Sequence, residues 1–209
     1  MIAIIDYGVG NLFSLQSCLN AIGEKAIVTS DKKLIHEADR IILPGVGAFE
    51  DAANKLRESG MADVIKTEVD QGKPLLGICL GMQLLLESSE EYGFHKGLGL
   101  IRGVNRFIGD YIPSDYKIPH MGWNSLIFTD KKHPLFRYTK EKEYVYFVHS
   151  YAGYECEENT IATTEYGAML TAAIANRNVM GTQFHPEKSG ESGLKIMKAF
   201  CELKKEDLC

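Results

Sequence analysis

The chain has 209 residues, of which 45% are hydrophobic and 24% are charged. This length and balance suit a single globular domain over residues 1–209 and exclude disordered and fibrous proteins. The formal net charge of -5 opposes nucleic acids and anionic membranes as main partners, because both are also negatively charged. No apolar run approaches the roughly 18 residues that a membrane span needs.

Five cysteines lie far apart in the chain, at positions 18, 79, 156, 201 and 209. An odd number without close spacing predicts neither a disulfide framework nor a zinc site. The first residues, MIAIIDYG, contain no basic segment and so do not read as a signal peptide. We therefore expect a cytoplasmic protein without a metal or cofactor, in which one thiol is reactive.

The first half of the chain alternates short apolar runs with amphipathic segments. Strands are predicted over 2–6, 25–29, 40–43 and 74–78, and helices over 12–22, from 31, from about 50 and over 61–71. This alternation predicts a parallel, doubly wound α/β sheet, with ligands at the carboxyl ends of its strands. Gly8 and Gly10 indicate a tight turn after the first strand. Nucleotide binding there is a lesser alternative, because Phe13 replaces the third glycine of a dinucleotide fingerprint.

The second half is richer in glycine and aromatic residues and predicts hairpins. Strands are expected at 93–94, 97–99, 104–107, 123–128, 144–148, 161–164, 169–175 and 179–184, followed by a helix over 190–205. The fold expected is therefore a mainly parallel central sheet with added antiparallel strands.

The most informative segment is Gly-x-Cys-x-Gly at residues 77–81, between an apolar run and a helical pattern. A sharp turn from strand to helix, with glycines on both sides, would project Cys79 from the top of the sheet. The positive end of the following helix favours the thiolate, which is the nucleophilic form. The alternative is a buried core cysteine, the commoner position of a lone cysteine.

A candidate base follows the last predicted strand. Of the six histidines, only His185 stands in a His-Pro-Glu segment at a strand end. Pro186 favours an extended backbone that places His185 and Glu187 on the same side, where the carboxylate fixes the imidazole tautomer. Cys79, His185 and Glu187 would then be nucleophile, base and orienting group. The loop at 44–47, Pro-Gly-Val-Gly, would supply half of an oxyanion hole or be merely another connection.

Six motifs in order resemble the class-I (triad) glutamine amidotransferases, and among them the glutaminase subunits of imidazole glycerol phosphate synthases. They are DYGVGNL at 6–12, PGVGAF at 44–49, GICLGMQLL at 77–85, IPHMGWN at 118–124, YFVHSY at 146–151 and QFHPEKS at 183–189.

The resemblance implies that Cys79 attacks the side-chain amide of glutamine and that His185 protonates the departing ammonia. It assigns the loop Gly45, Val46 and Gly47, with Leu80, to the oxyanion hole, and Gln83, Ser150 and Tyr151 to the amino acid end of glutamine. Ammonia would pass to a separate (β/α)8-barrel cyclase that makes imidazole glycerol phosphate and an aminoimidazole carboxamide ribonucleotide in histidine biosynthesis. The residues expected to face this heterodimer partner are Asn11, Trp123, Tyr138 and Lys188.

Three alternatives stay open on the sequence. The chain could serve a different synthase, making pyridoxal phosphate, anthranilate or guanylate, with the same chemistry and another partner. It could be a free-standing thiol hydrolase, although Leu80 follows Cys79 where one such group has histidine. A scaffold without activity is disfavoured because every triad position is filled.

Overall fold

The computed structural model describes residues 1–129 and 132–208. Its centre is an eight-stranded sheet in the order β2-β1-β3-β4-β14-β13-β12-β9. Its strands are β1 (Ile2–Ile5), β2 (Ala26–Thr29), β3 (Arg40–Leu43), β4 (Leu75–Ile78), β9 (Ile127–Phe128), β12 (Thr160–Glu165), β13 (Met169–Asn176) and β14 (Val179–Thr182). The first five strands of that order pair in parallel, and the last three add antiparallel pairs. The predicted fold class is therefore confirmed.

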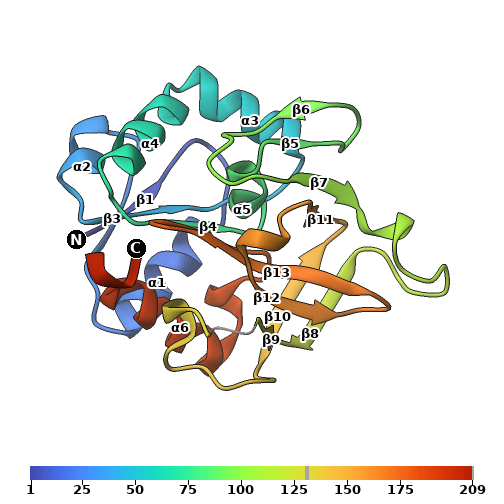
Figure 1. The fold of residues 1–209 in the computed structure, drawn as a ribbon. Helices are drawn as coiled ribbons and strands as arrows, with labels where there is room; N and C mark the ends of the chain where they lie inside the picture. The colour runs from blue at the N-terminus through green and yellow to red at the C-terminus, as the bar shows by residue number, and fades with distance from the viewer. Residues whose placement is uncertain (130–131, 209) are drawn as a thin grey trace.

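Helices cover both faces of the parallel part of the sheet (Figure 1). They are α1 (Leu12–Ala21), α2 (Lys32–Glu37), α3 (Phe49–Glu58), α4 (Met61–Asp70), α5 (Leu80–Leu85) and α6 (Gly190–Glu202). Side chains alternate along β1, so that Ala3 and Ile5 join the core beneath α2, α3 and α4, whereas Ile2 and Ile4 join the core beneath α1 and α6. A strand buried on both faces explains the continuous apolar run in the sequence.

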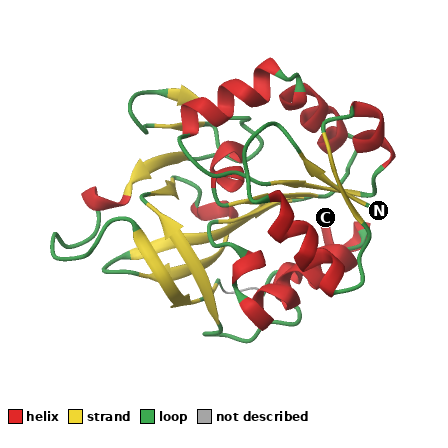
Figure 2. Cartoon of the chain, turned by 180° about the vertical axis from the view of Figure 1, so that it is seen from behind, coloured by secondary structure: helices red, strands yellow, loops and turns green. Residues whose placement is uncertain are grey.

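Two smaller sheets extend the molecule beyond the antiparallel end, as Figure 2 shows from behind. One pairs β8 (His120–Ser125) with β10 (Tyr144–His149), and the other has the order β11-β7-β5-β6, from β11 (Tyr151–Tyr154), β7 (Val104–Phe107), β5 (Ser88–Ser89) and β6 (His95–Lys96). Short 3-10 turns lie at Ile108–Asp110, Pro134–Phe136, Glu157–Asn159, Pro186–Lys188 and Lys205–Leu208.

Several predicted element boundaries were wrong. The strands expected at 93–94 and 97–99 are absent from the described chain, which has only β6 in this stretch. The N–H groups of Gly97 and Gly99 donate instead to the carbonyls of Glu87 and Leu86, just past α5, so this stretch packs as a loop against that helix. The predicted strand 123–128 is divided between β8 and β9, which belong to different sheets, and the last helix ends at Glu202 rather than 205.

No helix within residues 1–129 and 132–208 has the length and apolar character to cross a membrane. The order of the sheet matters more for function, because β3, β4 and β14 are parallel neighbours. Their carboxyl ends therefore lie side by side at one edge. The loop after β3, the turn after β4 and the segment after β14 all begin there.

Candidate active site

The turn after β4 holds Cys79 in a strained backbone conformation. Its φ of 55° and ψ of -112° lie where a residue with a side chain is uncommon, and α5 begins at the next residue. The N–H of Cys79 donates to the carbonyl of Thr182 on β14 at 2.7 Å, which fixes the turn to the neighbouring strand. A Cβ on Gly81 would lie 1.9 Å from the carbonyl oxygen of Leu43, so only glycine fits at this approach of α5 to β3. The sharp glycine-flanked turn predicted from the sequence is therefore present.

His185 and Glu187 form a buried pair beside this turn. Nδ1 of His185 lies 2.8 Å from Oε1 of Glu187, and the two side chains are 3% and 1% exposed. The backbone differs from the expectation of an extended segment, because Pro186–Lys188 is a 3-10 turn. Ser189 stabilises the turn, since its hydroxyl donates to the carbonyl of His185 at 2.6 Å.

The charges around His185 favour its protonated form. Burial alone would lower its pKa, but the Cys79 sulfur and the Glu187 carboxylate raise the pKa from 6.5 to about 9. At neutral pH the imidazole therefore carries a proton that it can give to a leaving group.

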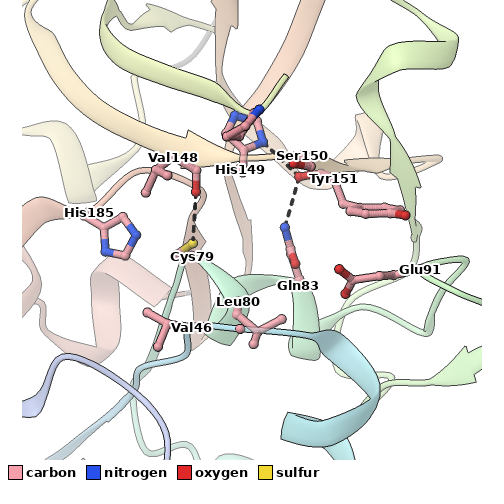
Figure 3. Close-up of a pocket in the computed structure, with 12 residues that line it drawn as sticks. Val46, Cys79, Leu80, Gln83, Glu91, Val148, His149, Ser150, Tyr151 and His185 are labelled. Atoms are coloured by element: carbon pink, nitrogen blue, oxygen red, sulfur yellow. Dashed lines mark hydrogen bonds between the residues drawn. The ribbon is translucent and has the colours of Figure 1, made fainter. Parts of the chain in front are cut away.

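The sulfur of Cys79 also contacts groups outside the His185–Glu187 pair. It lies 3.9 Å from the carbonyl oxygen of Val148 on β10, the acceptor within its reach, and accepts a hydrogen bond from Nε2 of Gln183 at 3.7 Å. Figure 3 shows the sulfur between His185 on one side and Gln83 on the other.

A single pocket surrounds the sulfur, and it brings together most residues predicted to bind substrate. Its lining comprises Val46, Gly47, Cys79, Leu80, Gln83, Glu91, Pro119, Val148, His149, Ser150, Tyr151 and His185 (Figure 3). Gly45 is the exception, because it packs behind the loop, where a Cβ would lie 2.8 Å from the backbone nitrogen of Gly81.

The pocket also contains groups that the sequence did not indicate. Glu91 follows β5 in an irregular loop and accepts a hydrogen bond from the N–H of Phe49 at 2.6 Å. Val148 contributes a backbone carbonyl, which any residue type would supply. No residue pattern marks either position, so only the fold could place them.

Polar contacts fix the wall formed by residues 149–151. Nδ1 of His149 and Nε2 of Gln83 both donate to the carbonyl oxygen of Tyr151, at 2.8 and 3.0 Å. Burial lowers the pKa of His149 to about 3, so its ring is neutral and its proton stays on Nδ1. Gln83 uses both amide hydrogens on the protein, because Nε2 also donates to Oε1 of Gln183 at 3.0 Å. Its own Oε1 is the part left to receive a ligand.

The four residues predicted at a partner interface have different local contacts. Trp123, 52% exposed, packs its ring 6.0 Å from the ring of Tyr146, and Nζ of Lys188 lies 6.0 Å over the same ring. Tyr138 instead contacts Glu202 at the end of α6. Asn11 is half-buried at the start of α1 and its side chain makes no capping hydrogen bond there.

Comparison with known proteins places the chain in a family. The model of the family described as glutamine amidotransferase class-I matches residues 3–203. The chain belongs to the class-I glutamine amidotransferases. This amidotransferase also has relatives that match it over nearly the full length. It is 52% identical over 202 residues to the imidazole glycerol phosphate synthase subunit HisH of Sulfurimonas denitrificans, and the match covers 96% of this chain and 97% of the relative. The HisH subunit of Oceanobacillus iheyensis is 49% identical, with 97% and 99% covered.

These relatives place the amidotransferase among the HisH subunits of imidazole glycerol phosphate synthase, as the sequence motifs implied, rather than among the other glutaminases. Solved structures agree on the fold. A crystal structure titled glutamine amidotransferase superposes with a TM-score of 0.75 at 18% identity, covering 97% of this chain and 98% of the other. The Thermotoga maritima PurLQS structure gives 0.73 at 22% identity, covering 96% of each chain.

Proposed function

We propose that this chain hydrolyses glutamine with Cys79, His185 and Glu187 and delivers the ammonia to the cyclase subunit of imidazole glycerol phosphate synthase, in the cytoplasm. The observation that carries the proposal is the meeting of a strained, helix-capping cysteine and a buried His185–Glu187 pair in one pocket. The relatives at about 50% identity supply the choice of synthase. The free thiols of the described cysteines agree with a reducing compartment.

In the first half of the reaction, the Cys79 thiolate attacks the side-chain carbonyl carbon of glutamine and forms a tetrahedral adduct. His185 then gives its proton to the amide nitrogen, the carbon–nitrogen bond breaks, and ammonia leaves. In the second half, His185 takes a proton from water, which attacks the γ-glutamyl thioester and releases glutamate. Glu187 keeps the proton of Nδ1 in place through both halves.

The developing oxyanion needs two N–H donors. Leu80 is the first residue of α5, where a backbone N–H has no partner within the helix, and it lines the pocket. The second donor is the N–H of Gly47, from the loop after β3. The space beside the Cα of Gly47 is open and Val46 is 43% exposed, so this peptide is free to turn toward the substrate.

The far end of the pocket suits the amino acid end of glutamine. Oε1 of Gln83 and the carboxylate of Glu91 are acceptors for the ammonium group, and the hydroxyl and backbone N–H groups of Ser150 and Tyr151 are donors for the carboxylate. The donors and acceptors of the pocket therefore match both charged groups at the amino acid end of the substrate.

The exposed Trp123, packed on the half-buried Tyr146, is the proposed anchor for the cyclase. Tyr146 belongs to β10, whose next residues reach the pocket at Val148, so a partner bound there lies close to the source of ammonia. Trp123 is exposed, and tryptophan and tyrosine are enriched among the residues that dominate the binding energy of interfaces.

The test measures glutamate release by the chain alone, with the cyclase, and with the cyclase plus its nucleotide substrate. We expect release to rise strongly only in the third mixture, because an incomplete oxyanion hole would restrain the free subunit. Vigorous glutamate release by the chain alone, unchanged by the cyclase, would support the triad chemistry and contradict the proposed partner. No release in any mixture would contradict the glutaminase itself.

A further inference from the structure

Gln183 lies directly behind the nucleophile and is completely buried. Its backbone N–H donates to the carbonyl of Ala172 on β13 at 2.8 Å, which fixes the residue just after β14. Its side chain makes two further contacts: Oε1 accepts from Nε2 of Gln83 at 3.0 Å, and Nε2 donates to Sγ of Cys79 at 3.7 Å. A buried amide with both ends engaged has one orientation.

That orientation is set by a backbone carbonyl. The carbonyl oxygen of Tyr151 can only accept, so the group of Gln83 that faces it must be its amide nitrogen. The same nitrogen then donates its second hydrogen to Gln183, which must accept it with its side-chain oxygen. The nitrogen of Gln183 is consequently turned toward the sulfur, and reversing it would set two donors against each other. The carbonyl of Tyr151 therefore orients the amide of Gln83, and Gln83 in turn orients the amide of Gln183 toward Cys79.

We propose that Gln183 is a positioning residue for the reaction, whose N–H donates to the Cys79 sulfur and stabilises the thiolate against the thiol. This inference rests on the proposed glutaminase function and extends it to a residue outside the triad. A hydrogen bond donated to a charged acceptor is stronger than one donated to a neutral group, so the N–H of Gln183 favours the anion. The carbonyl of Val148 acts in the opposite sense, because it can accept only from the thiol form.

The chain of amides also links the nucleophile to the substrate pocket. Gln83 lines the pocket, and Tyr151 lies at its amino acid end. Glutamine bound against Oε1 of Gln83 would polarise that amide and strengthen its N–H donation to Gln183. The sulfur would thereby receive a better donor once the substrate is in place.

The experiment measures the alkylation of Cys79 by iodoacetamide between pH 5 and 9, following the Cys79 peptide by mass spectrometry. The variants are Gln183→Met, which removes the donor at similar length, and Gln183→Glu, which keeps the acceptor for Gln83 and turns a carboxylate to the sulfur. Gln16→Met is the matched control, because it loses one side-chain hydrogen bond, to Ala26 at 3.2 Å on the edge strand β2.

Other titratable groups near the sulfur do not interfere. Burial raises the pKa of Tyr7 and lowers that of His149 to about 3, so both are neutral through most of the titration. His185 faces the sulfur, which raises the pKa of the imidazole, and Glu187 contacts His185 at Nδ1. Glu91 lines the same pocket in all variants. The midpoint therefore belongs to the Cys79–His185 pair.

We expect the midpoint to rise by about one pH unit in Gln183→Met, a tenfold loss of thiolate below the midpoint, and further in Gln183→Glu, with no change in Gln16→Met. An unchanged midpoint in either folded Gln183 variant would overturn the proposal. Failure of both variants to fold would also overturn it, since the residue would then serve the core.

Glutamine kinetics in the complex complete the test. A donor to the sulfur predicts that kcat falls in Gln183→Met while synthesis from added ammonium salt is retained. The two proposals fail differently: a wild-type chain without glutaminase activity contradicts the proposed function, whereas the alkylation midpoint still reports whether Gln183 stabilises the thiolate.

Discussion

Replacing Glu187 by glutamine tests the buried His185–Glu187 pair. The rise in the pKa of His185 from 6.5 to about 9 corresponds to roughly 3 kcal/mol in favour of the imidazolium, and this survives after the opposing effect of burial. Cys79 and Glu187 share that stabilisation. If Glu187 supplies somewhat less than half, its loss lowers the pKa of His185 by about one pH unit, or roughly 1 kcal/mol.

The substitution also removes control of the tautomer. Among the described residues, Oε2 of Glu187 has no hydrogen-bond partner, so nothing nearby holds a replacing amide with its oxygen toward Nδ1. An amide turned the other way would place the proton of the neutral imidazole on Nε2, so that this nitrogen could not take a proton from the attacking water. Together the two effects predict a fall in kcat of about 100-fold, less than the complete loss expected without the thiol.

Two measurements check this prediction. NMR titration of carbon-13-labelled histidine reports the pKa of His185, and glutamate release in the complex reports kcat. Glu191→Gln is the control, because that glutamate is 84% exposed on α6 and, among the described residues, its ion pair is with Lys195. A pKa that stays near 9 in Glu187→Gln would refute the assignment of the shift to this carboxylate.

Three further substitutions have distinct expected outcomes. Cys79→Ala should abolish glutamine-dependent synthesis and spare synthesis from ammonium salt, and loss of both in a folded complex would contradict separate ammonia production. Gly81→Ala should destabilise the fold by about 4 kcal/mol or more in denaturant unfolding, because its Cβ would meet the carbonyl of Leu43 at 1.9 Å. Glu68→Gln should cost about 3 kcal/mol at pH 7, because it leaves the nearly buried Lys73, 2.7 Å away, without its charge partner. Lys73 and His36 lower the pKa of Glu68 despite its burial, so this difference should vanish as the pH falls through that lowered value, below 4.5; a constant difference would be contradictory.

The sequence predicted the parts of the site that depend on local backbone geometry. The turn at Cys79 requires small neighbours within two residues, and a histidine two residues from a carboxylate can pair with it in more than one conformation. For this reason the His185–Glu187 contact was predicted correctly even though the expected extended backbone was wrong. The parallel strands were likewise visible because each is buried on both faces.

The remaining parts depend on contacts between distant segments. Gln183 acquires its orientation from Gln83, which is 100 residues away in the chain, and Glu91 reaches the pocket from a loop without a repeating pattern. The carbonyl of Val148 carries no signature in its side chain. Such groups are defined by the fold rather than by residue type, so the sequence alone could not identify them.

The strand β10 contacts both partners of the proton transfer through its backbone. The carbonyl of Tyr146 accepts from the N–H of His185 at 3.0 Å, and the carbonyl of Val148, two residues further on, lies 3.9 Å from the sulfur of Cys79. The backbone of one strand therefore contacts two groups that are far apart in the sequence. Because the ring of Trp123 packs on Tyr146 from the neighbouring strand, direct contacts join this exposed tryptophan to the strand that touches both His185 and Cys79.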